Sequence, residues 1–318
     1  MSAVPAGLGY ARVSLRSGAL AAAIAVTLVA APFYLAPYAT TTLTRMLVFG
    51  LFAASLDLLV GLIGLPSLGH AAYLGIGAYT AGWLALHGLT SPLALLLAAS
   101  ASALAGLGAG WISVRSSGIF FLILTLAIGE IAEQIAQSWT AVTGGSNGLY
   151  GIPAATVGPL TASDVASLYY YVLGGFGVGM AMLWSVSASP LGAALRGIRD
   201  NKTRMRALGY ESTRYELFAF VLAAAVAGFA GGLLAAQQRL VTPSDLGFTT
   251  SALALFAVVI GGSGRLWAAC LGAALIIGVR DVAGLTVNGH GPLLLGLLFI
   301  AAVYLMPHGI AGLPRRRK

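Results

Sequence analysis

The chain has 318 residues, of which 58% are hydrophobic and only 8% are charged, and its formal net charge at pH 7 is +8. Soluble domains carry roughly 25% charged residues, so this composition excludes a water-facing globular surface and indicates a protein solvated by lipid. The positive charge does not indicate binding to nucleic acid, because no basic stretch is interleaved with aromatic residues. Cys270 is the only cysteine, which excludes an intrachain disulfide and a cysteine metal site.

The charge-poor stretches predict an all-α, polytopic membrane protein with about ten transmembrane segments, some of them broken or short and rich in glycine. A helical span needs about 20 mostly apolar residues. The first stretch follows Arg12 and Arg16 and is longer than a typical signal-peptide core, so we interpret it as an uncleaved helix. The predicted spans are residues 18–38, 46–64, 70–87, 92–114, 118–139, 168–187, 217–236, 246–262, 266–284 and 292–306.

The apolar region from residue 246 to residue 282 is too long for one span. As a continuous helix it would measure about 55 Å, against a hydrocarbon core of about 30 Å. The sequence GSGR at 262–265 interrupts it. Two short spans or a re-entrant pair are therefore needed, and we favour two spans.

The basic residues predict that both termini are cytoplasmic. With ten crossings, only Arg45, Arg239 and Arg280 of the 17 Lys and Arg residues lie outside, in agreement with the positive-inside rule. Removing one crossing would place the basic C-terminal tail outside, which again favours ten.

Glycines four residues apart permit close approach of helix backbones and mark candidate helix contacts. With 43 glycines in the chain, each pair alone is a weak signal. The candidate pairs are Gly106/Gly110, Gly175/Gly179 and Gly228/Gly232.

Residues 61–80 form a glycine-rich segment that also contains Pro66. Proline removes a backbone donor and glycine lowers helix stability, so a continuous helix is disfavoured. A broken helix in a bilayer needs protein or a water-filled cavity around its backbone, and its half-helix ends can bind a carboxylate or an ammonium. A cytoplasmic turn between two spans, with His70 as an ordinary polar boundary residue, explains the pattern equally well.

Asp57 lies in the middle of a predicted span. A charge at the bilayer centre costs about 2.5–3.5 kcal/mol on insertion scales, so such a residue usually faces a cavity or a partner. The external segment 140–167 is rich in Gly, Thr and Ser, and its backbone donors suit a substrate vestibule. We therefore predict a substrate pathway with the candidate residues Asp57, Ser67, Gly69, His70, Gly144, Gly145 and Asn147.

Motifs for catalysis and for metal or nucleotide binding are missing. Residues 144–148 match Gly-x-Ser-x-Gly, but a nucleophile elbow needs a strand–turn–helix that this chain does not offer. HExxH is absent, the four histidines are scattered, and neither Lys202 nor Lys318 belongs to a phosphate-binding loop. We expect a protein that is not an enzyme, holds no metal or other cofactor, and depends on another chain for ATP-driven work.

Residues 189–216 form the one large basic loop, suited to a soluble partner in the cytoplasm. Apolar residues at helical spacing predict an amphipathic helix on the membrane, ended by Gly209. A plain anchor attracted to anionic lipid is the alternative, although an anchor needs neither Asp200 nor the glycines at 192, 197 and 209. The basic residues of this loop are Arg196, Arg199, Lys202, Arg204, Arg206 and Arg214.

Several ordered motifs carry a resemblance to a known family. They are SLGHAAYLGIGAYTAG (67–82), LTLAIGEI with TGGSNGLYGIP (124–131 and 143–153), the stretch 191–235, IGGSGRLWAACLGAALI (260–276) and MPHGIAGL (306–313). Over most of residues 45–313 the chain resembles the M-type (LivM-like) permease subunit of branched-chain amino acid ABC transporters. It departs from that pattern at Asp57, where Asn is more common, and at Leu65-Pro66, which replaces a more polar pair.

The resemblance implies a single permease domain over residues 1–318 in a bacterial inner membrane, importing branched-chain or related small amino acids. It implies a heterodimer with a homologous permease subunit, two cytoplasmic ATPase subunits that bind ATP, and a periplasmic solute-binding protein. Residues 189–216 would be the coupling loop, with one coupling helix from Gly192 to Gly209. The residues implied in coupling are Gly192, Arg196, Arg199, Asp200 and Gly209.

Two alternatives stay open. The stretch RDNKTRMRALGY (199–210) also resembles variants associated with urea, amide or other amino-acid uptake. A protein of another class, an ion-coupled secondary transporter, would use Asp57 and Glu130 to bind a proton or cation, but it has no need of a shaped basic loop.

Overall fold

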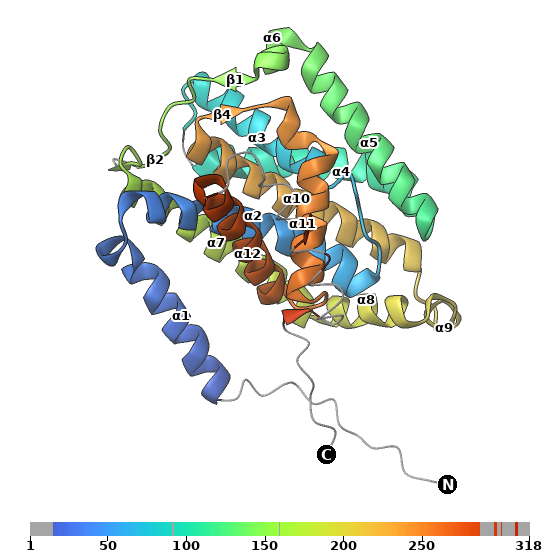
Figure 1. The fold of residues 1–318 in the computed structure, drawn as a ribbon. Coiled ribbons are helices and arrows are strands. Elements are labelled where there is room, and N and C mark those ends of the chain that lie inside the picture. The colour runs from blue at the N-terminus through green and yellow to red at the C-terminus, as the bar shows by residue number, and fades with distance from the viewer. Residues whose placement is uncertain are drawn as a thin grey trace.

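The computed structural model describes residues 15–90, 92–158 and 160–286, together with residues 296, 297, 300, 309 and 310. They form a bundle of helices with two small two-stranded sheets (Figure 1). The α-helices are α1 (Leu15–Tyr34), α2 (Pro37–Asp57), α3 (Ala71–Leu86), α4 (Pro92–Ser113), α5 (Ile119–Ser138), α6 (Thr140–Thr143), α7 (Val165–Ala188), α8 (Pro190–Asp200), α9 (Lys202–Ala207), α10 (Ser212–Gln238), α11 (Phe248–Gly261) and α12 (Leu266–Thr286). The other elements are the π-helix η1 (Leu58–Ile63), the 3-10 helices η2 (Gly145–Asn147) and η3 (Pro243–Leu246), and the strands β1 (Leu149–Tyr150), β2 (Thr156–Val157), β3 (Leu160–Thr161) and β4 (Leu240–Val241).

Helices α2 and α10 form the core. Helix α10 packs against α2, α3 and α4, and α2 also contacts α7, α11 and α12. Within their apolar windows, 83% of the α2–η1 residues and 67% of the α10 residues are buried, against 22% for both α5 and α7. The apolar residues of α5 and α7 therefore face mostly outward, as expected for helices that contact lipid.

The glycine pairs mark close helix contacts, as predicted. A Cβ atom added at Gly106 would lie 2.5 Å from the Cβ of Ala224, and one at Gly228 would lie 2.1 Å from the Oγ of Ser102. Both positions join α4 to α10. Because no side chain fits there, glycine allows these two backbones to approach closely.

Each of the first nine predicted spans coincides with a helix, and the tenth, 292–306, lies almost entirely outside the described residues. The predicted start of the second span at residue 46 was wrong, because α2 begins at Pro37. The hydroxyls of Thr40, Thr41 and Thr44 each donate to the carbonyl four residues earlier. The three hydroxyl groups thus make their hydrogen bonds to the backbone before them in the chain, so these threonines do not interrupt the helix.

The described helices fit a multi-pass membrane protein. By length and composition, five of them can each cross a membrane, and α11 with α12, bent by 117° at their junction, makes up to six. Helix α3 is apolar but has only 16 residues. Helix α11 has 14 residues, about 21 Å, which is shorter than a hydrocarbon core of about 30 Å. The total of about ten spans stays a prediction.

The glycine-rich segment is not a continuous helix, as predicted. Helical structure stops at Ile63 and resumes at Ala71, with Gly64 in the left-handed region at φ +80°. Most of the residues between are buried or half-buried. The structure thus has a largely buried turn between two core helices at this place.

The two ends of the bundle differ in their elements. At one end lie α8 and α9, and at the opposite end lie β4, β1 and α6 (Figure 1). Strand β4 pairs antiparallel with β1, with Leu149 opposite Val241. We name these the α8 end and the β4 end.

Candidate functional site

Helix α8 is a short amphipathic helix with a well-formed start. Ser189 caps it by accepting a hydrogen bond from Gly192 N, and Pro190 occupies the first helical position, where its fixed φ is favourable. Leu195 and Ile198 are buried against the bundle. Arg196, Arg199 and Asp200 lie on the exposed side of the helix.

The prediction of one helix from Gly192 to Gly209 was wrong. The structure has two helices, because Asn201 leaves the helical conformation (φ −160°, ψ 94°) and caps α9 by accepting a hydrogen bond of 2.8 Å from Arg204 N. Asn is among the strongest N-cap residues, so this break had a signal in the sequence. Gly209 follows the end of α9 with φ +89°, which confirms it as a helix stop.

Arg199 joins α8 to the core of the bundle. Its Nη1 donates a hydrogen bond to the carbonyl oxygen of Gly61 in η1. Close by, Gly264 N in the α11–α12 turn donates 2.8 Å to Oδ1 of Asp57, the last residue of α2. A Cβ at Gly61 would lie 2.4 Å from Gly264 N, so glycine is required for this approach. We call Asp57, Gly61, Arg199 and Gly264 the α8 junction.

Asp57 is fully buried in the α8 junction. Its Oδ2 atom has no hydrogen-bond partner among the described residues, and the positive charge of Arg199 acts on it. A buried carboxylate is stable only when compensated by such partners. The junction therefore links α2 to the α11–α12 turn through Asp57, and η1 to α8 through Arg199.

Two other predicted coupling residues, Arg196 and Gly192, shape the corner between α7 and α8. Arg196 Nη1 donates 2.9 Å to Ser187 O, across the α7–α8 corner. A Cβ at Gly192 would lie 2.4 Å from the same carbonyl oxygen, so this corner needs glycine. Asp200 is exposed. Arg199 is exposed as well, although its guanidinium group also bonds to the bundle, and its expected contact with an ATPase stays a prediction.

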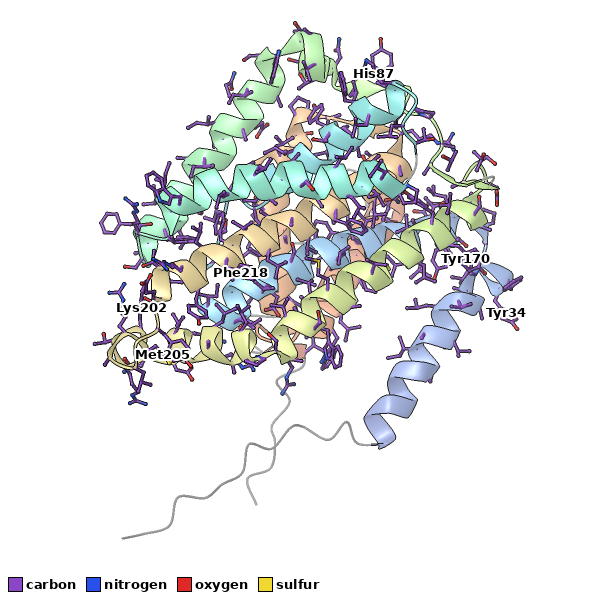
Figure 2. All side chains as sticks on the ribbon, turned by 180° about the vertical axis from the view of Figure 1, so that it is seen from behind. Tyr34, His87, Tyr170, Lys202, Met205 and Phe218 are labelled. Atoms are coloured by element: carbon purple, nitrogen blue, oxygen red, sulfur yellow. The ribbon has the colours of Figure 1, made fainter. Side chains whose placement is uncertain are left out.

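Helix α9 is tied to α10 by an ion pair that the sequence did not reveal. Lys202 Nζ lies 2.7 Å from Oε1 of Glu216, whose side chain is only 4% exposed. Figure 2 shows Lys202 and Met205 at the edge of the bundle, at the opposite end from His87. Lys202 and Glu216 are fourteen residues apart in sequence, so the i,i+3 and i,i+4 spacings that pair side chains on one helix could not predict this ion pair.

The predicted substrate-pathway residues near the turn are packed rather than open. His70 is fully buried, stacks on Phe52 and places Nε2 3.0 Å from the Oγ of Ser55. Ser67 is also fully buried. A Cβ at Gly69 would lie 1.9 Å from Thr125 O, so Gly69 permits contact with α5. These three residues lie in the protein interior.

The second predicted group lies in the loop at the β4 end. Gly144 and Gly145 have φ +77° and +65°, which only glycine adopts easily. Asn147 is exposed. Its neighbour Gly148 approaches β4 so closely that a Cβ would lie 2.2 Å from Val241 O. The structure does not bring this loop together with Asp57, which sits at the α8 junction.

A cavity of 540 Å³ lies toward the β4 end, between α2, α3, α10, η3, α11 and α12. We call it the β4 cavity. This cavity was not predicted from the sequence. Arg45 and Arg280 were used there only to orient the chain in the membrane, and Asp245 and Asp281 were given no role. It is lined by Thr41, Arg45, Val48, Phe49, Phe52, Leu74, Leu234, Gln237, Gln238, Leu240, Asp245, Thr250, Leu253, Ile276, Ile277, Arg280 and Asp281.

The acidic residues of the β4 cavity are held in place. Thr42 Oγ1 donates 2.6 Å to Oδ2 of Asp281, and Oδ1 of Asp281 lies 4.0 Å from Arg45 Nη1. Asp245 accepts hydrogen bonds from the backbone N (2.8 Å) and hydroxyl (3.0 Å) of Thr242. Within the described residues, no three His, Cys, Asp or Glu side chains gather so as to hold a metal ion.

Comparisons with known proteins agree with this architecture. A family model described as branched-chain amino acid transport system / permease component matches residues 38–305. The chain is 32% identical to the high-affinity branched-chain amino acid transport system permease protein LivM of Salmonella typhimurium, over 92% of this chain and 74% of that protein. It is 28% identical to the corresponding permease protein BraD of Pseudomonas aeruginosa, over 85% of this chain and 93% of that protein.

A more distant similarity exists to LivH of Escherichia coli, also named a high-affinity branched-chain amino acid transport system permease protein, with 22% identity over 85% of this chain and 93% of that protein. No solved structure gives a significant match. The family model covers most of the chain, and each of these relatives is named as a transport permease. The chain therefore belongs to the permease-component family of branched-chain amino acid transport systems.

Proposed function

We propose that this chain is the permease subunit of an ATP-driven importer that moves branched-chain or related small amino acids across a bacterial inner membrane. The observation that carries the proposal is the α8 junction. There a basic surface helix is connected, through Arg199, to the π-helical end of the central helix α2. Family membership supports the same function.

The proposed partners follow from the family to which the chain belongs. The chain matches both LivM and LivH, two permease proteins named from one organism, Escherichia coli. This supports a pore made with a homologous second subunit, with residues 1–318 as one permease domain. Two cytoplasmic ATPase subunits would bind the ATP, and a periplasmic binding protein would deliver the solute. The chain would cross the membrane about ten times with both termini cytoplasmic.

Coupling would begin at the exposed face of α8 and α9. In this proposal an ATPase docks on Arg196, Asp200 and the basic residues of α9, and displaces α8 when it closes on ATP. Arg199 passes the displacement to Gly61, and Gly264 is drawn along through Asp57. The helices α2, α11 and α12 would then shift between outward- and inward-open states, whose populations are set by differential binding of the ATPase.

A π-helix is suited to such a place. It is rare, often occurs at functional sites, and marks a helix held away from its preferred hydrogen-bonding pattern. Here η1 continues α2 directly and ends at Gly64, against which the Arg199 side chain lies. A small displacement of Arg199 would therefore act on a segment that can change its helical register.

The test is reconstitution of this chain with the ATPase, permease and binding-protein chains encoded beside it. ATP-dependent uptake of L-leucine into proteoliposomes is expected. Arg199→Glu should reduce uptake at least tenfold without preventing assembly, because a carboxylate would stand near the buried Asp57. Arg214→Glu is the matched control, because Arg214 and its partner Glu211 are both mostly exposed, and it should retain uptake.

Two results would contradict the proposal. Uptake driven by an imposed ion gradient without ATP would support the secondary transporter, with Asp57 and Glu130 as ion-binding residues. ATP-driven uptake of urea or a short amide, with no transport of amino acids, would support the alternative substrate class. Normal uptake by Arg199→Glu would overturn the role given to the α8 junction.

A further inference from the structure

The β4 cavity combines an apolar floor with charged groups of both signs. Val48, Phe52 and Ile276 in its wall are buried hydrophobic residues. Its charged residues are two arginines and two aspartates, which leaves no net charge among the four. Its volume of 540 Å³ falls within the range of about 300–1,000 Å³ typical of small-molecule sites.

The two aspartates of the cavity are each held by a threonine, whereas neither arginine donates a hydrogen bond to a described residue. Asp281 is held by Thr42, and Asp245 by Thr242. The side chain of Arg45 is 50% exposed and lies 4.0 Å from Asp281, a loose ion pair. Arg280 is exposed and has no acidic partner among the described residues. A guanidinium group with free donors is suited to a carboxylate, which it can bind through two parallel hydrogen bonds.

An acceptor in the same wall lacks a partner. The Oε1 atom of Gln237 is buried and makes no hydrogen bond with any described residue. A buried acceptor without a donor is costly, and a ligand ammonium would satisfy it once the amide group of Gln237 turns into the cavity. The ammonium would also be attracted by Asp281, whose Oδ1 is held only loosely by Arg45.

We infer that the β4 cavity is a binding site for a zwitterionic α-amino acid with an apolar side chain. The carboxylate would be bound by Arg280 and Arg45, the ammonium by Asp281 and Gln237, and the side chain would pack on Phe52 and the apolar wall. The inference rests on the proposed function, because it supplies the substrate contact of that importer.

Other ligand classes fit this cavity less well. A simple anion would be repelled by Asp245 and Asp281, and a simple cation by Arg45 and Arg280. Urea and short amides carry no charge, so they would leave four charged side chains without a matching partner. A zwitterion meets both signs, and its apolar side chain accounts for the hydrophobic floor.

The experiment uses the complete complex in nanodiscs, without the binding protein, and measures equilibrium binding of tritiated L-leucine. Competition is tested with leucinamide, which lacks the carboxylate, and with 4-methylpentanoate, which lacks the ammonium. Both should compete at least tenfold more weakly than L-leucine. This comparison uses the wild-type chain, so it does not depend on the folding of any variant.

Two variants test which side chains bind the carboxylate and the ammonium of the ligand. Arg280→Gln and Asp281→Asn should each weaken L-leucine binding at least tenfold and raise the KM for uptake. Arg239→Asn is the control, because it removes a positive charge at the end of α10 from a residue that does not line the cavity. Asn also tolerates the left-handed conformation of Arg239, whose φ is +55°.

The outcomes separate this inference from the proposed function. ATP-driven leucine uptake with no leucine binding to the complex, or with equal competition by leucinamide, overturns the inference and leaves the importer intact. Unchanged binding in both variants does the same. Absence of any ATP-driven amino acid uptake overturns the proposed function, and the inference with it.

Discussion

The α8 junction and the β4 cavity both contain charged residues within the bundle, but they use them in opposite ways. At the junction, Asp57 is fully buried, and glycine allows backbones to meet around it. In the cavity, Arg45 is half-exposed and its ion pair with Asp281 is loose. A closely packed contact transmits displacement, because it has little room to deform. An open site with loosely paired charges can exchange its internal partners for a ligand.

The largest effect is expected where the junction is tightest. In Gly61→Ala, the new Cβ would lie 2.4 Å from Gly264 N and 2.6 Å from Oδ1 of Asp57. The contact between η1 and the α11–α12 turn must then open. Uptake of L-leucine by the reconstituted complex should fall more than tenfold, with a lower Tm of the complex.

The control for this variant is Gly177→Ala on α7. A Cβ at Gly177 has no neighbour within 4 Å, so this substitution meets no obstacle. In a helix interior, replacing glycine by alanine even favours the helix by up to about 1 kcal/mol. Equal uptake and Tm in the two alanine variants would show that close packing at the junction is not needed.

A second test compares a buried ion pair with an exposed one on the same loop. Lys202→Ala leaves Glu216 buried without its partner, and we expect a loss of about 1–3 kcal/mol in the free energy of unfolding. Arg214→Ala breaks the exposed pair with Glu211 and should cost less than about 1 kcal/mol. Thermal unfolding of both variants in the same detergent measures the difference. Equal Tm values would mean that burial of Glu216 does not strengthen the α9–α10 connection.

A smaller effect is expected from loosening an acceptor in the β4 cavity. Thr42→Val removes the hydroxyl that donates to Asp281, an interaction worth about 1 kcal/mol, which corresponds to about fivefold in KM for L-leucine uptake. Thr41→Val is the matched control, because Thr41 also lines the cavity but its hydroxyl donates to Pro37 O on its own helix. A KM that changes equally in both variants would argue against a specific role of Asp281.

The smallest effect concerns a charge that belongs to neither region. Hydrogen bonds from Ser167 to Asp164, the exposed N-cap of α7, lower the pKa of that carboxyl below its ordinary value of 3.8. A lowered folded-state pKa means that the charged cap stabilises the fold above pH 3.8, and that this contribution is lost as the pH falls through the lower value. Asp164→Ala should therefore lower Tm slightly at pH 7 and less in strong acid. A Tm difference that grows on acidification would contradict this assignment.

Much of the fold could be predicted because its signals are local. Apolar stretches located the helices, Gly64 and Pro66 marked the interruption after η1, and paired glycines marked the contacts between α4 and α10. The start of α2 was predicted too late, because threonines that bond to their own helix look polar in the sequence. The break at Asn201 was overlooked, although its capping chemistry was visible.

The candidate sites were less predictable. Asp57 was predicted to face a cavity or a partner, and the hydrogen bond that the structure gives it comes from Gly264, 207 residues away. Arg199 was recognised as part of the coupling loop, yet its contact with Gly61 spans 138 residues. The cavity pair Arg45 and Asp281 comes from the two ends of the described chain. No periodicity relates such positions.

The sequence by itself determined that this protein is a helical membrane protein with a basic amphipathic loop, and its motifs carried the family resemblance. Composition and periodicity suffice for this, because they show which face of each helix contacts lipid or protein and which contacts water. Only the tertiary structure decided that Asp57 bonds to the α11–α12 turn close to the contact of Arg199 with Gly61, and that charges of both signs surround a cavity at the other end. Those contacts depend on how distant helices pack, and packing is determined by the shapes of all neighbouring side chains together.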